Sequence, residues 1–124
     1  MATRGIGLTP SEVVAEWLRA FNAGDAEAMV ALYAEDATHT SPKLRVAQPA
    51  TGGRIDGKAA MRKWWASTFE RSPGMRYDVI TTVANEDAAV IEYMRIKPGE
   101  PPMRVAEVFE VRAGKIVRSH VFHG

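Results

Sequence analysis

The chain has 124 residues, and its 16 lysines and arginines nearly balance its 15 aspartates and glutamates. This length predicts one domain, residues 1–124, of which residues 1–8 are expected to be flexible, and the interspersed charges exclude the basic surface typical of nucleic-acid-binding proteins. There is no apolar run long enough to span a membrane, no secretory signal, no cysteine and no cofactor motif, so we expect a cytoplasmic protein without membrane contact, bound metal or cofactor.

Two helices are predicted near the start of the chain. Thr9-Pro10-Ser11-Glu12 has the capping-box pattern with proline at the first helical position, and apolar residues then recur at helical spacing as far as Phe21. Asp25 can cap a second, short helix whose apolar stripe is Met29, Leu32 and Tyr33. The two helices are therefore expected almost back to back.

The middle of the chain predicts a short strand, a loop and a third helix. Residues 37–41 favour a strand that runs into Pro42, and the stretch from there to Arg54 is interpreted as a loop with at most one weak strand. Asp56-Gly57 opens a helix that ends at Ser72-Pro73-Gly74.

The second half changes to the alternating pattern of strands. We expect strands near 75–84, 88–97, 102–112 and 115–123, separated by segments of hairpin composition. Helices followed by a meander indicate an α+β domain in which three helices pack on one face of a curved antiparallel sheet. A sheet covered in this way forms a cone, and the open mouth of a cone is a natural pocket for a small molecule.

One carboxylate stands on an otherwise apolar strand face. Between 103 and 111, alternate positions carry Met, Val, Glu, Phe and Val, which places Glu107 among core residues. A lone buried charge is costly, so Glu107 needs either a fixed partner, for which Arg95 on the preceding strand is a candidate, or a cavity in which a raised pKa is useful.

Several segments of the chain resemble a known superfamily. They are Trp17 to Asp25 (WLRAFNAGD), Ala31 to Ala37 (ALYAEDA), Asp56 to Met61 (DGKAAM) and Gly114 to Val117 (GKIV). They are similar to the nuclear transport factor 2-like superfamily, in particular to its ketosteroid-isomerase-like and SnoaL-like branches. The resemblance covers nearly the whole chain and implies the cone-shaped, cystatin-like fold. It leaves the activity open, because this fold hosts isomerases, cyclases, dehydratases, epoxide hydrolases and non-catalytic domains.

The resemblance also implies positions for a site and for an interface. The general-base aspartate of steroid isomerases matches Ser41, their oxyanion-hole tyrosine matches Trp17, and their protonated acid matches Glu107, so standard steroid isomerisation is not expected. Val105 and Val121 disfavour the epoxide-hydrolase pattern. The family often dimerises through the convex sheet face, and a homodimer is expected here because apolar residues are predicted to face outward, among them Val108, Ile116 and Phe122.

His39 and Glu107 are the catalytic candidates. His39 shares a strand face with Ser41 and has a residue type suited to proton abstraction near neutral pH, although a histidine between two threonines is often only a surface residue. The remaining candidates, for ligand binding, are Trp17, Tyr33, Ser41, Met61, Trp64, Trp65, Tyr93, Arg95, Met103, Phe109 and His123.

The sequence leaves the direction of three groups of side chains open. Hydropathy alone would bury Val90, Glu92 and Met94, whereas the resemblance points Tyr93 and Arg95 inward, and we follow the resemblance. Adjacent tryptophans on one helix face different ways, so one of the pair at 64 and 65 is expected nearer the pocket and the other nearer its rim. His123 is placed on the inner face by the resemblance, but fraying is expected at a chain end.

The sequence therefore predicts a pocket for a small, largely apolar molecule. The predicted chemistry is proton transfer next to a carbonyl, of the isomerase, cyclase or dehydratase type, in which His39 moves the proton and Glu107, with Tyr93 or Arg95, stabilises negative charge on oxygen. Two alternatives remain, a binding module without chemistry and a protein-association domain.

Overall fold

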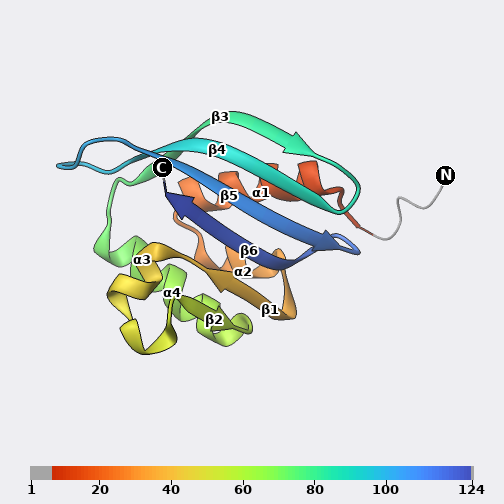
Figure 1. The fold of residues 1–124 in the computed structure, drawn as a ribbon, viewed down its shortest axis with the longest axis horizontal. Helices are drawn as coiled ribbons and strands as arrows, with labels where there is room; N and C mark the ends of the chain where they lie inside the picture. The colour runs from red at the N-terminus through yellow and green to blue at the C-terminus, as the bar shows by residue number, and fades with distance from the viewer. Residues whose placement is uncertain (1–6, 124) are drawn as a thin grey trace.

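The computed structural model describes residues 7–123 and shows helices packed on one six-stranded sheet (Figure 1). The helices are α1 (Pro10–Asn22), α2 (Ala26–Ala31), α3 (Pro42–Ala47), the 3-10 turn η2 (Pro49–Thr51) and α4 (Lys58–Arg71). The strands are β1 (Tyr33–Thr40), β2 (Arg54–Asp56), β3 (Arg76–Ala84), β4 (Ala88–Ile96), β5 (Met103–Arg112) and β6 (Lys115–His123). None of the helices in residues 7–123 is long and apolar enough to cross a membrane.

The sheet is mixed and open, with the strand order β2-β1-β6-β5-β4-β3. The four predicted meander strands are present and pair antiparallel in chain order. The sheet was predicted to be antiparallel throughout, but β1 runs parallel to β6. Figure 1 shows α1 behind β4 and β5, while α4 lies near β1 and β2. The α+β prediction is confirmed.

Both predicted helix starts are confirmed. The Thr9 side chain accepts a hydrogen bond from the Glu12 backbone N–H, and the Glu12 carboxylate accepts one from the Thr9 N–H at 2.9 Å. The Asp25 carboxylate accepts the Ala28 N–H at 3.0 Å and so caps α2. Residues 1–6, which hold most of the segment predicted to be flexible, lie outside the described residues.

The region between α2 and α4 differs from the prediction. Tyr33 is not part of a helical stripe, because α2 ends at Ala31 and Tyr33 begins β1, where it pairs with Ile116 of β6. The stretch up to Arg54, interpreted as a loop with at most one weak strand, contains α3, η2 and the first residue of β2, so residues 7–123 hold four α-helices where three helices were predicted. Ser41 caps α3 and Pro42 is its first residue, which is a typical sequence signal for the start of a helix. The helix itself is only six residues long.

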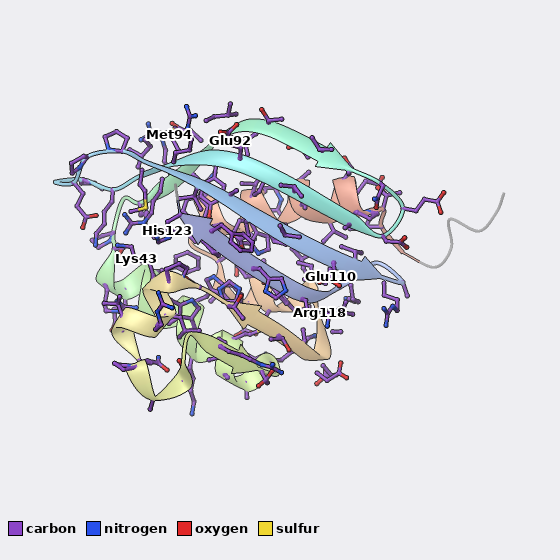
Figure 2. The ribbon with its side chains drawn as sticks, viewed as in Figure 1. Lys43, Glu92, Met94, Glu110, Arg118 and His123 are labelled. Atoms are coloured by element: carbon purple, nitrogen blue, oxygen red, sulfur yellow. The ribbon has the colours of Figure 1, made fainter. Side chains whose placement is uncertain are left out.

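The faces of β4 follow the resemblance and not the hydropathy. Ile91, Tyr93 and Arg95 are buried, whereas Glu92 and Met94 lie toward the outer side of the sheet (Figure 2). The inward face of β4 joins an aromatic cluster with α1, since Tyr93 stacks on Tyr77 at 4.1 Å and Tyr77 stacks on Trp17 at 5.9 Å between ring centroids.

One predicted outward residue is buried. Ile116 is fully buried, because a register shift between Glu110 and Val111 reverses the inside-outside alternation at the start of β6. Phe122 is 56% exposed, and other exposed apolar residues of the sheet are Val79, Ile80, Val83 and Val90. The homodimer through the outer sheet face stays a prediction.

Candidate functional site

A pocket of about 310 Å³ lies between the inner face of the sheet, α1, α3 and α4. Its volume is at the small end of the range for ligand sites. Predicted site residues from distant parts of the chain meet in its lining, namely Trp17, His39, Ser41, Trp64, Trp65, Tyr93, Arg95, Glu107 and His123. The sheet and the helices therefore bring both catalytic candidates to one cavity.

The other predicted site residues lie outside this lining. Tyr33, Met61 and Phe109 are completely buried in the core, and Met103 is partly buried against it. Tyr33 stands behind the lining and contacts it by accepting the indole N–H of Trp17, while its hydroxyl also lies 2.9 Å from Oγ of Ser119, which is outside the lining.

Both tryptophans of α4 contact the pocket, although their surroundings differ. Trp65 packs beside Tyr33 and His39, with ring centroids 5.2 and 5.0 Å away. Trp64 lies under the Arg71 guanidinium, whose central carbon is 5.5 Å from the ring centroid. Trp65 is thus nearer the buried polar residues, and Trp64 is nearer an exposed charge.

Several lining residues were not predicted from the sequence. Arg71 shares a face of α4 with Trp64, seven residues earlier, so helical spacing could have indicated it. Tyr77 pairs in register with Arg95 and stacks on Tyr93 at 4.1 Å, but only the strand register reveals this. Lys43 comes from α3, a helix in a segment that was predicted to be a loop.

Glu107 is 1% exposed and makes one hydrogen bond. The Tyr93 hydroxyl donates to its Oε1 at 2.9 Å, while Oε2 is buried without a partner in the described part of the chain. Burial raises the pKa of Glu107 from 4.5 to about 8, although the hydrogen bond from Tyr93 acts in the opposite direction. The carboxyl group is therefore mainly protonated at neutral pH.

The alternative in which Arg95 neutralises Glu107 is not what the structure shows. Nη1 of Arg95 donates to Oε1 of Glu100 at 3.1 Å, on the loop between β4 and β5. Glu107 consequently lacks a cationic partner among residues 7–123.

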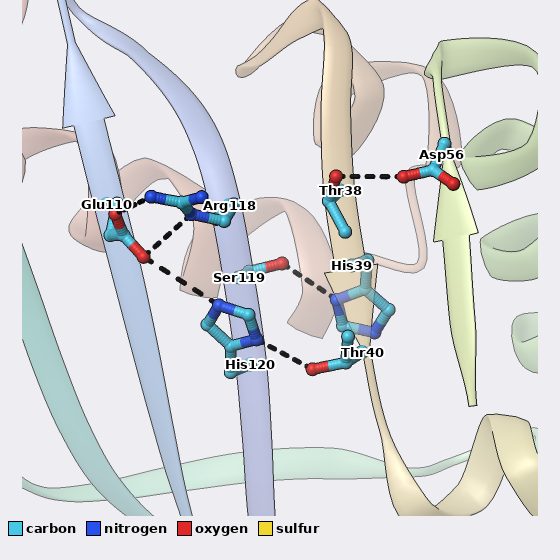
Figure 3. Close-up of polar contacts among 8 residues, drawn as sticks. All are labelled: Thr38, His39, Thr40, Asp56, Glu110, Arg118, Ser119 and His120. Atoms are coloured by element: carbon cyan, nitrogen blue, oxygen red, sulfur yellow. Dashed lines mark hydrogen bonds and ion pairs between the residues drawn. The ribbon is translucent and has the colours of Figure 1, made fainter. Parts of the chain in front are cut away.

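His39 belongs to a buried chain of hydrogen bonds. Its Nδ1 lies 2.7 Å from Oγ of Ser119, which lies 2.9 Å from the Tyr33 hydroxyl, which accepts the Trp17 indole N–H at 3.2 Å. Figure 3 shows His39 reaching from β1 to Ser119 on the neighbouring strand β6. Burial lowers the pKa of His39 to about 3, and His120 contributes to this shift, so the imidazole is neutral at pH 7.

The direction of this chain decides which imidazole nitrogen carries the proton. The buried Tyr33 hydroxyl accepts from Trp17 and can donate its own hydrogen to Oγ of Ser119. We infer that Ser119 donates in turn to Nδ1 of His39, which is then the unprotonated ring nitrogen. In this arrangement the proton is on Nε2, which lacks a partner among residues 7–123, so His39 presents an N–H donor.

Ser41 and His120 have structural partners. Oγ of Ser41 accepts the Lys43 N–H at 3.1 Å as the cap of α3. His120 lies on the outer side of the sheet, with Nδ1 2.7 Å from the Thr40 hydroxyl and Nε2 3.7 Å from Glu110, which also binds Arg118 (Figure 3). This outer network is separate from the pocket.

The described residues do not assemble a metal site. No group of three or more histidine, aspartate or glutamate side chains lies close enough together within residues 7–123 to hold an ion. The residues that can bind a ligand in the pocket are hydrogen-bonding groups, aromatic rings and cationic side chains.

The chain belongs to the SnoaL-like domain family, because the family model of the SnoaL-like domain matches residues 14–119. This confirms the resemblance at the level of the family. No sequence of a curated protein matches the chain significantly.

Solved structures support the same fold. A SnoaL-like protein of unknown function from Burkholderia thailandensis is 24% identical, with a TM-score of 0.78 over 98% of this chain and 97% of that one. A "putative polyketide cyclase" from Sinorhizobium meliloti is 19% identical, with a TM-score of 0.74 over 90% and 94%. A cystatin-fold protein from Novosphingobium aromaticivorans is 19% identical, with a TM-score of 0.77 over 94% and 99%.

Proposed function

We propose that this protein binds a small carbonyl compound with a mainly apolar body and that Glu107 transfers a proton next to the carbonyl group. The reaction type would be an isomerisation, cyclisation or dehydration. The observation that carries the proposal is the carboxyl group of Glu107, which is buried at the pocket, has no cationic partner among the described residues and has one free oxygen.

The environment of Glu107 suits this chemistry. A carboxylate with a pKa of about 8 is a stronger base than an ordinary one, and proton transfer is most effective when the pKa of the group lies near the working pH. Tyr93 holds Oε1, so the proton is exchanged at Oε2.

His39 has a different role in this proposal from the one predicted from its residue type. An imidazole with a pKa of about 3 is a weak base at pH 7, and its Nδ1 is already occupied by Ser119. Its Nε2–H can instead donate to the carbonyl oxygen as negative charge develops there. Glu107 then moves the proton, and His39 stabilises the enolate oxygen.

Among the alternatives, the open pocket supports ligand binding over pure protein association. Trp17, Trp64 and Trp65 border the cavity without filling it, and a volume of about 310 Å³ stays free. The "putative polyketide cyclase" with the same fold is consistent with a carbonyl substrate, although the likeness itself shows only the fold. A binding module without chemistry is the second candidate, and the experiment below separates the two.

Deuterium exchange into 2-tetralone tests the proposal, because exchange at the carbon beside the carbonyl requires removal of a proton and return of a deuteron. We expect the protein in D2O to accelerate exchange, measured by NMR, with a rate that rises as pH increases through about 8. Glu107→Gln should abolish the acceleration, whereas Glu92→Gln, on the outer side of β4, should retain it.

Binding of 2-tetralone should be measured on the same samples by calorimetry. Binding without accelerated exchange would support the non-catalytic module. Equal exchange by the wild-type protein and Glu107→Gln would contradict the assignment of Glu107.

A further inference from the structure

The charged side chains of the pocket are almost all cationic. Lys43, Arg71, Arg95 and Lys97 line it, and the one carboxyl group in its lining is that of Glu107, which is mainly protonated at neutral pH. The whole chain has a net charge of only +1, so this excess is a property of the pocket and not of the overall composition.

Arg95 is the best placed of these groups to bind an anion. Arg95 is 7% exposed and lines the cavity. One of its nitrogens, Nη1, binds Glu100, whereas Nε and Nη2 have no hydrogen-bond partner in the part of the chain that the structure describes. A guanidinium group with free donors in a cavity matches the planar geometry of a carboxylate.

Lys43 adds a second charge at the same end of the cavity. It has no carboxylate partner within residues 7–123, and its ammonium group and Arg95 both contribute to lowering the pKa of His123, after the larger effect of burial. Figure 2 shows Lys43 and His123 near the end of β6. Lys43 and Arg95 therefore act on one region, which is next to the C-terminal end of that strand.

Glu100 already occupies part of this region. Its carboxylate lies 3.1 Å from Nη1 of Arg95 and 3.3 Å from Nζ of Lys97, and its side chain is 41% exposed on the β4–β5 loop. The single negative charge of Glu100 balances only one of the two positive charges of Arg95 and Lys97. Lys43 adds a further positive charge to this region. The contact also demonstrates that Arg95 can bind a carboxylate from the side of this loop.

We propose that the pocket selects ligands that carry a carboxylate, which binds Arg95 and Lys43 while the planar apolar part lies against Trp64, Trp65 and Tyr77. In this arrangement Glu100 competes with the ligand for Arg95. The inference rests on the proposed binding function and narrows its ligand class from apolar carbonyl compounds to carbonyl compounds whose aromatic or conjugated body also carries a carboxylate.

Matched probes test the charge requirement. We expect 2-naphthoate to bind about tenfold more tightly than 2-naphthamide in calorimetry at pH 7 and low salt, because the two differ chiefly in charge and a charge-assisted hydrogen bond supplies about that factor. 2-Naphthyl phosphate serves as the alternative anion and should bind less tightly than 2-naphthoate. Added salt should weaken binding of the two anions and leave that of the amide unchanged.

Substitutions of opposite sign test the residues. Lys43→Met should weaken 2-naphthoate binding several-fold with no change for the amide, whereas the matched control Lys63→Met removes an exposed charge outside the pocket and should change neither. Glu100→Gln should tighten 2-naphthoate binding. Arg95→Met should abolish the preference for the acid, and Lys43→Met provides the exposed variant if Arg95→Met does not fold.

The relative affinities of the three probes separate the charge selection, the carboxylate preference and the binding function. Equal affinity for acid and amide would overturn the charge selection and leave the proposed binding function intact. Tighter binding of the phosphate than of the acid would overturn the carboxylate assignment. If none of the naphthalene probes binds while 2-tetralone does, this inference fails and the proposed function stands, and if 2-tetralone does not bind either, both fail.

Discussion

The Tyr93 hydroxyl donates a 2.9 Å hydrogen bond to Oε1 of Glu107, while Oε2 of the same carboxyl group has no partner in residues 7–123. The two residues lie on adjacent antiparallel strands, Tyr93 on β4 and Glu107 on β5. This asymmetric contact fixes the orientation of the carboxyl group and leaves one oxygen for a ligand.

Tyr93→Phe should raise the pKa of Glu107 above about 8, because the lost hydrogen bond favours the ionised carboxylate. The midpoint of the pH profile for 2-tetralone exchange should therefore move to higher pH. We also expect a loss of about 1–3 kcal/mol in unfolding free energy, since a buried acceptor loses its donor. Tyr33→Phe is the control, because its hydroxyl binds Ser119 and not Glu107. An unchanged midpoint in Tyr93→Phe would contradict the assignment.

Stability should fall between pH 6.5 and pH 8. The pKa of Glu107 is raised from 4.5 to about 8, so the folded state binds its proton more tightly and loses stability as pH rises through this window. The expected loss is about 1.4 kcal/mol per pH unit in urea unfolding. Glu107→Gln should make this part of the profile flat.

The acid side should show the opposite slope, caused by His39. Its pKa is lowered from 6.5 to about 3, so the unfolded state binds more protons and acidification destabilises the fold. Between pH 4.5 and 6.5 the two residues nearly cancel, and below 4.5 the His39 contribution is no longer offset. His39→Gln should remove the cancellation, so that stability falls steadily from pH 4.5 upward. A flat profile from pH 4.5 to 8 in this variant would contradict the raised pKa of Glu107, and a profile equal to that of the wild-type protein would contradict the lowered pKa of His39.

Ser119→Ala should change the tautomer of His39. In the inferred direction of the chain from Tyr33 through Ser119, the imidazole proton of the wild-type protein is on Nε2, and nitrogen NMR of labelled histidine should report this tautomer. Without the serine hydroxyl, Nδ1 loses its donor and the other tautomer should become populated. His120 and His123, whose imidazole rings have no hydrogen bond to the Ser119 side chain, provide internal references. Detection of Nδ1–H in the wild-type protein would refute the proposed direction of the chain.

The sequence predicted those parts of the fold that depend on local signals. The capping box at Thr9, the cap at Asp25 and the alternation of β4 to β6 each determine an element within a few residues. Tyr33 was assigned to the wrong element, because its place in β1 depends on pairing with Ile116, more than eighty residues away. The short helix α3 was missed for a different reason, since six residues give too little periodicity to distinguish a helix from a loop.

Burial of Glu107 was predictable from strand alternation alone, but the identity of its partner was not. Arg95 was a reasonable candidate from its position on the neighbouring strand, yet its guanidinium group turns to Glu100 on the loop. The protonation of His39 depends on Ser119 and Tyr33, which come together only when β1 pairs with β6. Side-chain partners set by tertiary structure are thus what the sequence could not supply.

The most direct test of the account is an NMR titration of the Glu107 carboxyl carbon in the wild-type protein, with Glu107→Gln used to assign the signal. We expect a titration midpoint near pH 8, well above the ordinary value of 4.5. A midpoint at or below the ordinary value of 4.5 would mean that the group is ionised throughout the physiological range, and would contradict the proposed proton-transfer role.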